Sequence, residues 1–179
     1  SHKGKQAMRL TFRGRAAHSA QPAAGVNANY AGAALMLAIR DLDARRTVEG
    51  PFDPRFDPPQ STLVAGVVRG GTAVNIIPEQ CVVEFEVRGI PADDPAAIAA
   101  EVEAAAAALV AEGAALGCTA ERLSAYPALP PAGAGLAALL ERLTGQAPLQ
   151  SVSYGTEAGL FQAAGIPAIV CGPGEIARA

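Results

Sequence analysis

The chain has 179 residues, half of them hydrophobic, with 4% aromatic residues, no tryptophan and a formal net charge of −3. That length suits one domain, or a small domain with part of another, and the slight acidity removes the electrostatic reason to expect a nucleic-acid partner. No apolar run is long enough to span a bilayer and no signal-like leader opens the sequence, so we expect a cytoplasmic protein. The three scattered cysteines, Cys81, Cys118 and Cys171, indicate reduced thiols rather than a disulfide framework or a zinc site.

The first strand and helix are predicted from their periodicities. Residues 8–13 alternate apolar and polar side chains, which indicates a strand with one face on a core. Asn27 is a good N-cap for a helix that begins at residue 28. This helix has two apolar stripes, which predict two partners, a sheet and another subunit. The main stripe comprises Ala31, Ala34, Leu35, Ala38, Ile39 and Leu42, and the second comprises Ala33, Met36 and Leu37.

The next elements complete a recognisable order. Four prolines in residues 51–60 exclude regular structure there. Residues 62–68 and 81–88 have strand patterns and should pair as antiparallel neighbours. Asp94 and Pro95 form a cap and first turn for a second helix, and residues 118–126 indicate a last strand. The order β-α-β-β-α-β predicts an α+β fold, a ferredoxin-like two-layer sandwich.

The pattern changes in the Pro- and Gly-rich stretch 126–135, where we place a domain boundary. Beyond it we expect a helix near 136–143, a strand near 149–153, a helix near 156–164 and a continuous apolar strand at 166–171. Such an apolar strand suits a parallel sheet buried on both faces, which needs more strands than this segment supplies. Residues 1–126 are therefore predicted to be one domain, and residues 127–179 a piece of a larger α/β domain.

The stretch R-G-G-T-A-V-N-I-I-P, residues 69–78, stands out in the middle of the chain. Its two glycines permit a positive φ or a close approach to another group. Asn75 lies between apolar residues, so its amide must find hydrogen-bond partners or be held out for a ligand. We therefore treat it as a candidate binding residue.

Four motifs resemble those of the co-catalytic zinc amidohydrolases and peptidases, the family of acetylornithine deacetylase, succinyl-diaminopimelate desuccinylase, aminoacylase and related carboxypeptidases. They are G-R-A-A-H-S-A-Q-P near the start, G-G-T-A-V-N-I-I-P-E in the middle, E-V-R-G-I-P after it, and S-Y-G-T-E-A-G-L-F-Q near the end. The resemblance runs nearly end to end, and the G-T-E-A-G wording is most similar to acetylornithine deacetylases.

The resemblance implies that the chain contains parts of two domains with different roles. Residues 1–126 look like the family's lid and homodimerisation domain, and residues 127–179 like an incomplete C-terminal segment of the zinc catalytic domain. The family's metal ligands lie mainly upstream of the lid and are missing here. We therefore expect zinc or cobalt only in the intact parent, no metal on this fragment, and no activity from the fragment alone.

The resemblance also assigns roles to particular residues. His18 looks like the lid histidine that reaches across the dimer and, when neutral, can donate an N–H to the oxyanion. Asn75 resembles an asparagine that binds substrate across the dimer. Arg88 suits a bidentate clamp on a substrate carboxylate. The loop Gly155, Thr156 and Glu157 is expected to face a small N-acyl amino acid substrate.

Each of these residues also has a purely structural interpretation. His18 could be a surface or capping histidine, and Asn75 a turn amide bonded to its own backbone. Arg88 could form a cross-strand ion pair with its glutamate neighbours. Thr156 could simply cap a helix, with Glu157 compensating its dipole. His2, near the chain end, is expected to be solvated.

The predicted activity is cleavage of an amide bond in N-acyl amino acids, with N-acetylornithine as the first choice of substrate. Desuccinylase, aminoacylase and carboxypeptidase activities stay open within the family. From another class, a non-catalytic ferredoxin-like module could bind RNA or serve as a regulatory ligand-binding dimer. The lack of basic charge and of an aromatic-rich sheet motif argues against RNA.

Overall fold

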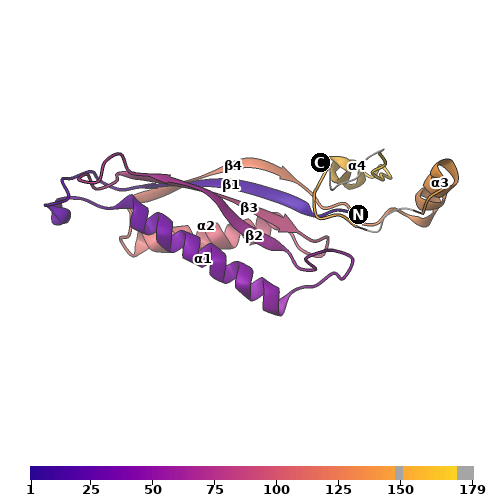
Figure 1. Cartoon of the computed structure of the whole chain (residues 1–179), viewed down its shortest axis with the longest axis horizontal. Helices are drawn as coiled ribbons and strands as arrows, with labels where there is room; N and C mark the ends of the chain where they lie inside the picture. The colour runs from indigo at the N-terminus through magenta and orange to yellow at the C-terminus, as the bar shows by residue number, and fades with distance from the viewer. Residues whose placement is uncertain (148–150, 173–179) are drawn as a thin grey trace.

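The computed structural model describes residues 1–147 and 151–172, and its first 126 residues have the predicted order of elements (Figure 1). These are β1 (Gly4–Arg13), a short 3-10 helix η1 (Pro22–Ala24), α1 (Ala28–Glu49), β2 (Thr62–Gly70), β3 (Gln80–Gly89), α2 (Pro95–Ala111) and β4 (Gly117–Tyr126). The strands form one antiparallel sheet in the order β2-β3-β1-β4. The ferredoxin-like prediction is confirmed.

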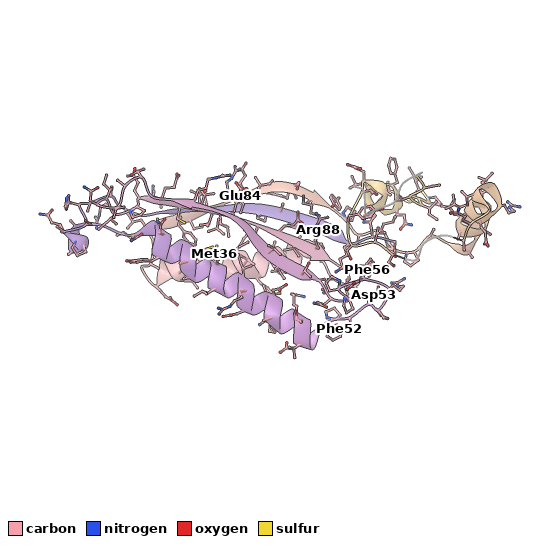
Figure 2. The ribbon with its side chains drawn as sticks, viewed as in Figure 1. Met36, Phe52, Asp53, Phe56, Glu84 and Arg88 are labelled. Carbon is pink, nitrogen blue, oxygen red and sulfur yellow. The ribbon has the colours of Figure 1, made fainter. Side chains whose placement is uncertain are left out.

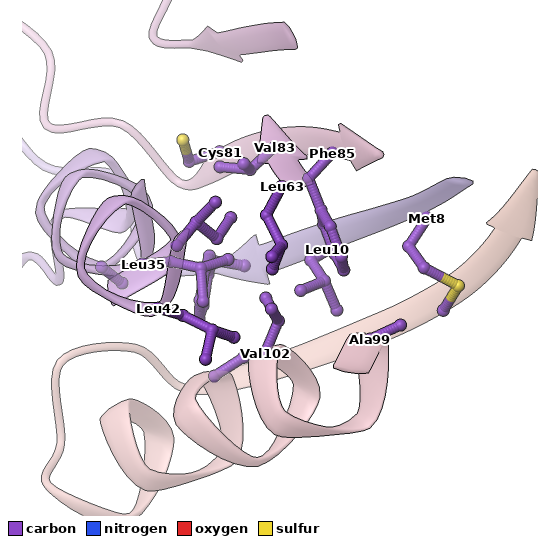
Figure 3. Close-up of a cluster of buried hydrophobic side chains, with 14 of the residues drawn as sticks. Met8, Leu10, Leu35, Leu42, Leu63, Cys81, Val83, Phe85, Ala99 and Val102 are labelled. Atoms are coloured by element: carbon purple, nitrogen blue, oxygen red, sulfur yellow. The ribbon is translucent and has the colours of Figure 1, made fainter. Parts of the chain in front are cut away.

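The core forms where the two-residue period of the strands meets the helices. Every second residue of β1 and β3 is buried, and Met8 and Leu10 of β1 stand opposite Phe85 and Val83 of β3. The two helices cover this face of the sheet, and Figure 3 shows Leu35 of α1 and other apolar side chains meeting the strands. The alternate residues occupy the opposite face and include the charged side chains Lys5, Arg9, Glu84, Glu86 and Arg88. Burial of apolar side chains between the helices and this one face of the sheet therefore stabilises the fold.

Both helices begin where the sequence predicts. The Asn27 side chain accepts a hydrogen bond from Asn29 N–H at the start of α1, and the Asp94 side chain accepts one from Ala96 N–H at the start of α2. Pro95 occupies the first turn of α2, where a missing N–H costs nothing. These caps position the helix starts, and hence the loops that precede them.

The two stripes of α1 have different surroundings. In the main stripe Ala31, Leu35, Ile39 and Leu42 are buried, although Ala34 and Ala38 are only half-buried. In the second stripe Leu37 is 52% exposed and Ala33 is exposed as well. The sheet is therefore the partner of the first stripe, and within one chain the second stripe lies largely open.

The segment after residue 126 differs in part from expectation. It contains α3 (Ala134–Thr144) and α4 (Ala158–Ala163), which lie beyond the end of the sheet (Figure 1). The strand predicted at 166–171 is absent, because a buried parallel strand needs neighbouring strands that this segment does not provide. Of the strand predicted at 149–153, residues 149 and 150 fall outside the described residues, and Val152 forms only an isolated parallel bridge with His2. No helix in the described ranges is long and apolar enough to cross a membrane.

Candidate functional site

Two loops meet at the end of the sheet where β1 finishes and β3 begins. One is the segment 14–27 between β1 and α1, and the other is the segment 71–79 between β2 and β3. His18 forms an isolated antiparallel bridge with Ile76, and Ser19 N–H donates to the Asn75 carbonyl over 3.0 Å. Ile77 N–H also donates to the Ala17 carbonyl, over 2.8 Å. The backbone therefore brings two predicted site residues, His18 and Asn75, together. We call this pair of loops the distal loops.

The His18 side chain is exposed but held by its own turn. Ala20 N–H donates to Nδ1 over 3.1 Å. Because Nδ1 accepts, a neutral His18 imidazole carries its proton on Nε2, the nitrogen that points away from the turn. The local bond fits the capping interpretation, yet it also leaves a fixed N–H donor at the surface. His18 can therefore be bonded within its own turn and still offer an N–H donor at the surface.

The adjacent glycines act in the two ways expected. Gly71 has φ +86°, a conformation that favours glycine. A Cβ on Gly70 would lie 1.9 Å from Oδ1 of Asn29, so α1 can approach the loop only because Gly70 has no side chain. Asn29 Oδ1 is buried with no hydrogen-bond partner among the described residues. Asn75 lies exposed in the turn that follows.

An open groove of about 750 Å³ lies between the start of α1 and the second distal loop. Asn29, Tyr30, Gly71 and Val74 contribute to its walls. His18 and Asn75 do not line it, so they present their side chains outside the groove. In one chain these two residues form an exposed point of contact rather than the wall of a cavity.

Arg88 lies near the far end of β3, on the charged face of the sheet (Figure 2). Its guanidinium donates to Glu86 through Nε and to the Tyr126 hydroxyl through Nη1, the latter over 2.7 Å. Lys5 Nζ lies 3.0 Å from the other Glu86 oxygen. Burial alone would raise the pKa of Glu86, but hydrogen bonds from Arg88 and Lys5 outweigh it and lower the pKa. An ion pair is therefore present, along the strand, with Lys5 as the cross-strand partner.

The loop 155–157 lies against this end of the sheet. A Cβ on Gly155 would lie 2.1 Å from Cε2 of Tyr126, so only glycine allows the loop to contact that ring. Thr156 Oγ1 accepts from Ala158 N–H over 3.1 Å, but the N-cap of α4 is Glu157, so Thr156 is not the N-cap that the sequence suggested. Glu157 is exposed. Tyr126 thus joins Arg88 to the loop 155–157, and we call this group the junction cluster.

The expectation for His2 is wrong, because its side chain is fully buried in the junction cluster. Its ring meets Tyr126 edge-on with centroids 6.1 Å apart, and its Nε2 accepts from Thr156 N–H. Burial is the main cause that lowers the pKa of His2. The neighbouring Lys3 is also buried and donates to the carbonyls of Pro58 and Gln60. Local sequence gives no signal for this, because the covering residues come from distant segments.

The predicted site residues therefore fall into two separate groups. Nearly the whole length of β3, Gln80–Gly89, separates the distal loops from Arg88. At about 3.3 Å per residue this is roughly 25 Å. A single chain cannot place His18 and Arg88 around the same small molecule.

Metal binding is not supplied by the part of the chain that the structure describes. Within residues 1–147 and 151–172, no three His, Cys, Asp or Glu side chains lie together so that they could hold a metal ion. The side chains of these described residues thus do not fit a catalytic zinc site.

Comparison of this sequence with known families and proteins gives matches that agree with one another. Residues 1–114 match the family described as the peptidase dimerisation domain. The chain is 30% identical over 177 residues to an acetylornithine deacetylase of Myxococcus xanthus, which covers 98% of this chain and 46% of that protein. An acetylornithine deacetylase of Aliivibrio salmonicida is 34% identical over 90 residues, 50% of this chain and 24% of that protein. The chain thus spans less than half the length of these relatives.

Comparison with solved structures agrees on the fold. The aminopeptidase PepT of Bacillus cereus superposes with a TM-score of 0.69 at 21% sequence identity, covering 93% of this chain and 42% of that chain. At this identity the likeness shows the fold alone.

Proposed function

Since this chain belongs to the M20 peptidase dimerisation domain family, we propose that it is part of a metal-dependent hydrolase that cleaves the amide bond of N-acyl amino acids. Residues 1–126 act as lid and dimerisation domain, and residues 127–179 belong to the catalytic domain. The observation that carries the proposal is the similarity over 177 residues to the Myxococcus xanthus acetylornithine deacetylase. N-acetylornithine, cleaved to ornithine and acetate, is therefore the proposed substrate.

The intact enzyme is proposed to use zinc or cobalt, which in hydrolases activates water and polarises the carbonyl. In the family that the sequence motifs resemble, the metal ligands lie mainly upstream of the lid, so we propose that the part of the protein outside this chain supplies them. On that proposal the 179-residue chain is expected to have no hydrolase activity by itself.

His18 is proposed to stabilise the negative charge that develops on the carbonyl oxygen during amide cleavage. Its Nδ1 is occupied by Ala20 N–H, so the proton of the neutral ring sits on Nε2 and can be donated outward. A preorganised donor of this kind stabilises an oxyanion without reorganisation during the reaction. Asn75, joined to the same loop through its backbone, is proposed to bind substrate beside it.

Arg88 and the loop 155–157 are proposed to bind the substrate from the junction cluster. A guanidinium suits a carboxylate, and Arg88 is already fixed by the Tyr126 hydroxyl. The contact of Gly155 with Tyr126 keeps the loop beside Arg88. Glu157, exposed at this loop, is proposed to meet the amine of the substrate.

The separation of the two groups supports a dimer in which each active site is shared. Roughly 25 Å lies between the distal loops and Arg88, given the spacing of residues along a strand. In a symmetric dimer, the distal loops of one copy can reach the junction cluster of the other. We therefore propose that His18 and Asn75 act across the dimer.

The surface best suited to this pairing is the β2 edge of the sheet with the second stripe of α1. β2 is an edge strand, and Val64 and Val68 on it are 60% and 52% exposed. An edge of this kind is a template for pairing with another chain. Leu37 on α1 adds an exposed apolar residue on the helix that packs beside β2. Two copies joined here would form one continuous sheet.

The oligomer can be tested by mass measurement at several concentrations. Leu37→Glu should shift the intact protein toward the monomer, because it places a charge in the proposed interface. Leu116→Glu is the matched control, since Leu116 is 50% exposed just before β4, the edge strand opposite β2. An unchanged mass for Leu37→Glu would rule out this surface.

The shared site has a sharper test in subunit mixing. The intact protein, supplied with zinc or cobalt, is assayed for acetate release from N-acetylornithine as His18→Ala and Arg88→Ala variants, alone and after mixing. Loss of one oxyanion donor should lower turnover by about a hundredfold. If the sites are shared, random mixing of the two variants restores about a quarter of the sites, because each mixed dimer has one intact site. No gain on mixing would refute action across the dimer.

A further inference from the structure

His2 uses both nitrogens of a fully buried imidazole. Nδ1 lies 2.8 Å from the Lys3 carbonyl oxygen, which can only accept, so Nδ1 carries the proton and donates. Nε2 is then an acceptor. Thr156 N–H donates to it over 3.3 Å, and Thr156 Oγ1 lies 3.2 Å away. One neutral tautomer therefore satisfies every hydrogen bond of the ring.

The Thr156 hydroxyl is directed by its other contact. Its oxygen accepts from Ala158 N–H over 3.1 Å, so its own hydrogen is available for His2 Nε2. The backbone and side-chain donors of Thr156 thus converge on one acceptor. Loss of that acceptor would leave both donors without a partner in a largely buried place.

The backbone of His2 is itself fixed from two sides. His2 N–H donates to the Leu129 carbonyl and Leu129 N–H to the His2 carbonyl, each over 3.0 Å. Val152 N–H donates to the Ser1 carbonyl, also over 3.0 Å. The residue therefore joins the start of β1 to two segments that follow β4. Together with the hydrogen bonds at both ring nitrogens, these backbone bonds set the position of the imidazole.

The His2 imidazole lies beside the groups proposed to bind the substrate. The His2 ring packs against Tyr126, whose hydroxyl accepts from Arg88, and Gly155 lies against the hydroxyl end of the same Tyr126 side chain. The loop 155–157 is thus fixed relative to Arg88 by two contacts, a hydrogen bond to His2 and a close approach to Tyr126.

We propose that His2 is a positioning residue, whose neutral Nε2 holds the loop 155–157 in place to receive the substrate beside Arg88. The substrate part of this inference rests on the proposed function, whereas the hold on the loop stands on the contacts alone. His2 lies outside the four motifs that resemble the family.

Two polar variants separate the acceptor from the rest of the side chain. In His2→Gln the side-chain oxygen can replace Nε2 as acceptor. In His2→Asn the shorter amide can still donate to the Lys3 carbonyl, in place of Nδ1, but does not reach Thr156. Both are made in the intact protein, and a melting curve shows that each variant is folded.

The first readout is hydrogen exchange of the Thr156 amide, which does not depend on activity. Loss of one hydrogen bond should speed this exchange by about tenfold in His2→Asn, and His2→Gln should restore the slow rate. The second readout is the kinetics of N-acetylornithine hydrolysis. In His2→Asn we expect KM to rise several-fold with kcat nearly unchanged, as when ground-state and transition-state binding are lost equally.

The outcomes are distinguishable. Faster exchange and a higher KM in His2→Asn, both reversed in His2→Gln, would support the proposal. Unchanged Thr156 exchange in His2→Asn would overturn it. Faster exchange with an unchanged KM would overturn the positioning role and the substrate role of the loop together. A parent with no hydrolase activity would overturn the proposed function and the substrate part, while exchange would still decide whether His2 holds the loop.

Discussion

Gly32 of α1 packs against Cys81 of β3. This contact predicts that Gly32→Ala destabilises the chain when Cys81 is present and stabilises it when Cys81 is replaced by alanine. Gly32 is buried in the helix, and a Cβ there would lie 2.4 Å from Cys81 Sγ. Forcing a methyl into a packed core costs about 1–3 kcal/mol. Replacing a mid-helix glycine by alanine gains about 0.5–1 kcal/mol in helix propensity. Gly32→Ala alone should therefore lower the free energy of unfolding, by up to about 2 kcal/mol.

Removing the sulfur should reverse this result. In a Cys81→Ala background the nearest remaining atoms to the new methyl are Cβ of residue 81 at 3.4 Å and Val83 Cγ2 at 3.5 Å, both ordinary contacts. Gly32→Ala should then stabilise the chain by up to about 1 kcal/mol, because only the propensity term remains. The coupling between the two positions should be about 1–3 kcal/mol.

Urea unfolding of the four members of this cycle, followed by far-UV circular dichroism, measures the coupling. Gly66→Ala in β2 is the control, since a Cβ there meets no atom within 4 Å and should not couple to Cys81. If Gly32→Ala changes stability equally in both backgrounds, the helix does not rest on Cys81 as described. The same result would refute the close approach of α1 to the sheet.

Three further outcomes follow from buried and charged groups. Lys3→Met should lower the free energy of unfolding by about 2 kcal/mol, because the carbonyls of Pro58 and Gln60 lose a charged donor. An unchanged midpoint in urea would contradict a stabilising role for these two hydrogen bonds. Cys81 should react with a thiol reagent far more slowly than exposed Cys171, since burial raises the pKa of the Cys81 thiol; equal rates in the folded chain would contradict its burial. Hydrogen bonds lower the folded pKa of Glu86 below its usual 4.5, so its stabilisation is complete above that pH and is lost as pH falls through the folded pKa; acid titration of Glu86→Gln should show a shallower loss, and an unchanged profile would count against the ion pair.

Some parts of the candidate site could be predicted from local sequence. Gly71 with its positive φ and the exposed Asn75 follow from the R-G-G-T-A-V-N stretch, because turn chemistry depends on nearest neighbours. The contact between His18 and that stretch was not visible in the sequence, since 58 residues separate His18 and Ile76 and only strand pairing brings them together. The residue roles taken from the family resemblance stay predictions.

Local sequence patterns were enough to predict the strands and the two long helices of the first 126 residues, and their order. Alternation in β1 and β3, the caps at Asn27 and Asp94, and the glycine turns are local signals, and together they admit few topologies.

Which polar residues are buried, and which of them lie together, depends instead on how distant segments pack in the folded chain. His2 and Lys3 are covered by segments more than fifty residues away, so the period of their own neighbourhood carries no trace of it. The strand expected at 166–171, which is not formed, also shows that a local pattern is not sufficient. Its apolar pattern is complete, but a strand exists only through hydrogen bonds to neighbouring strands, and the described residues provide none for it.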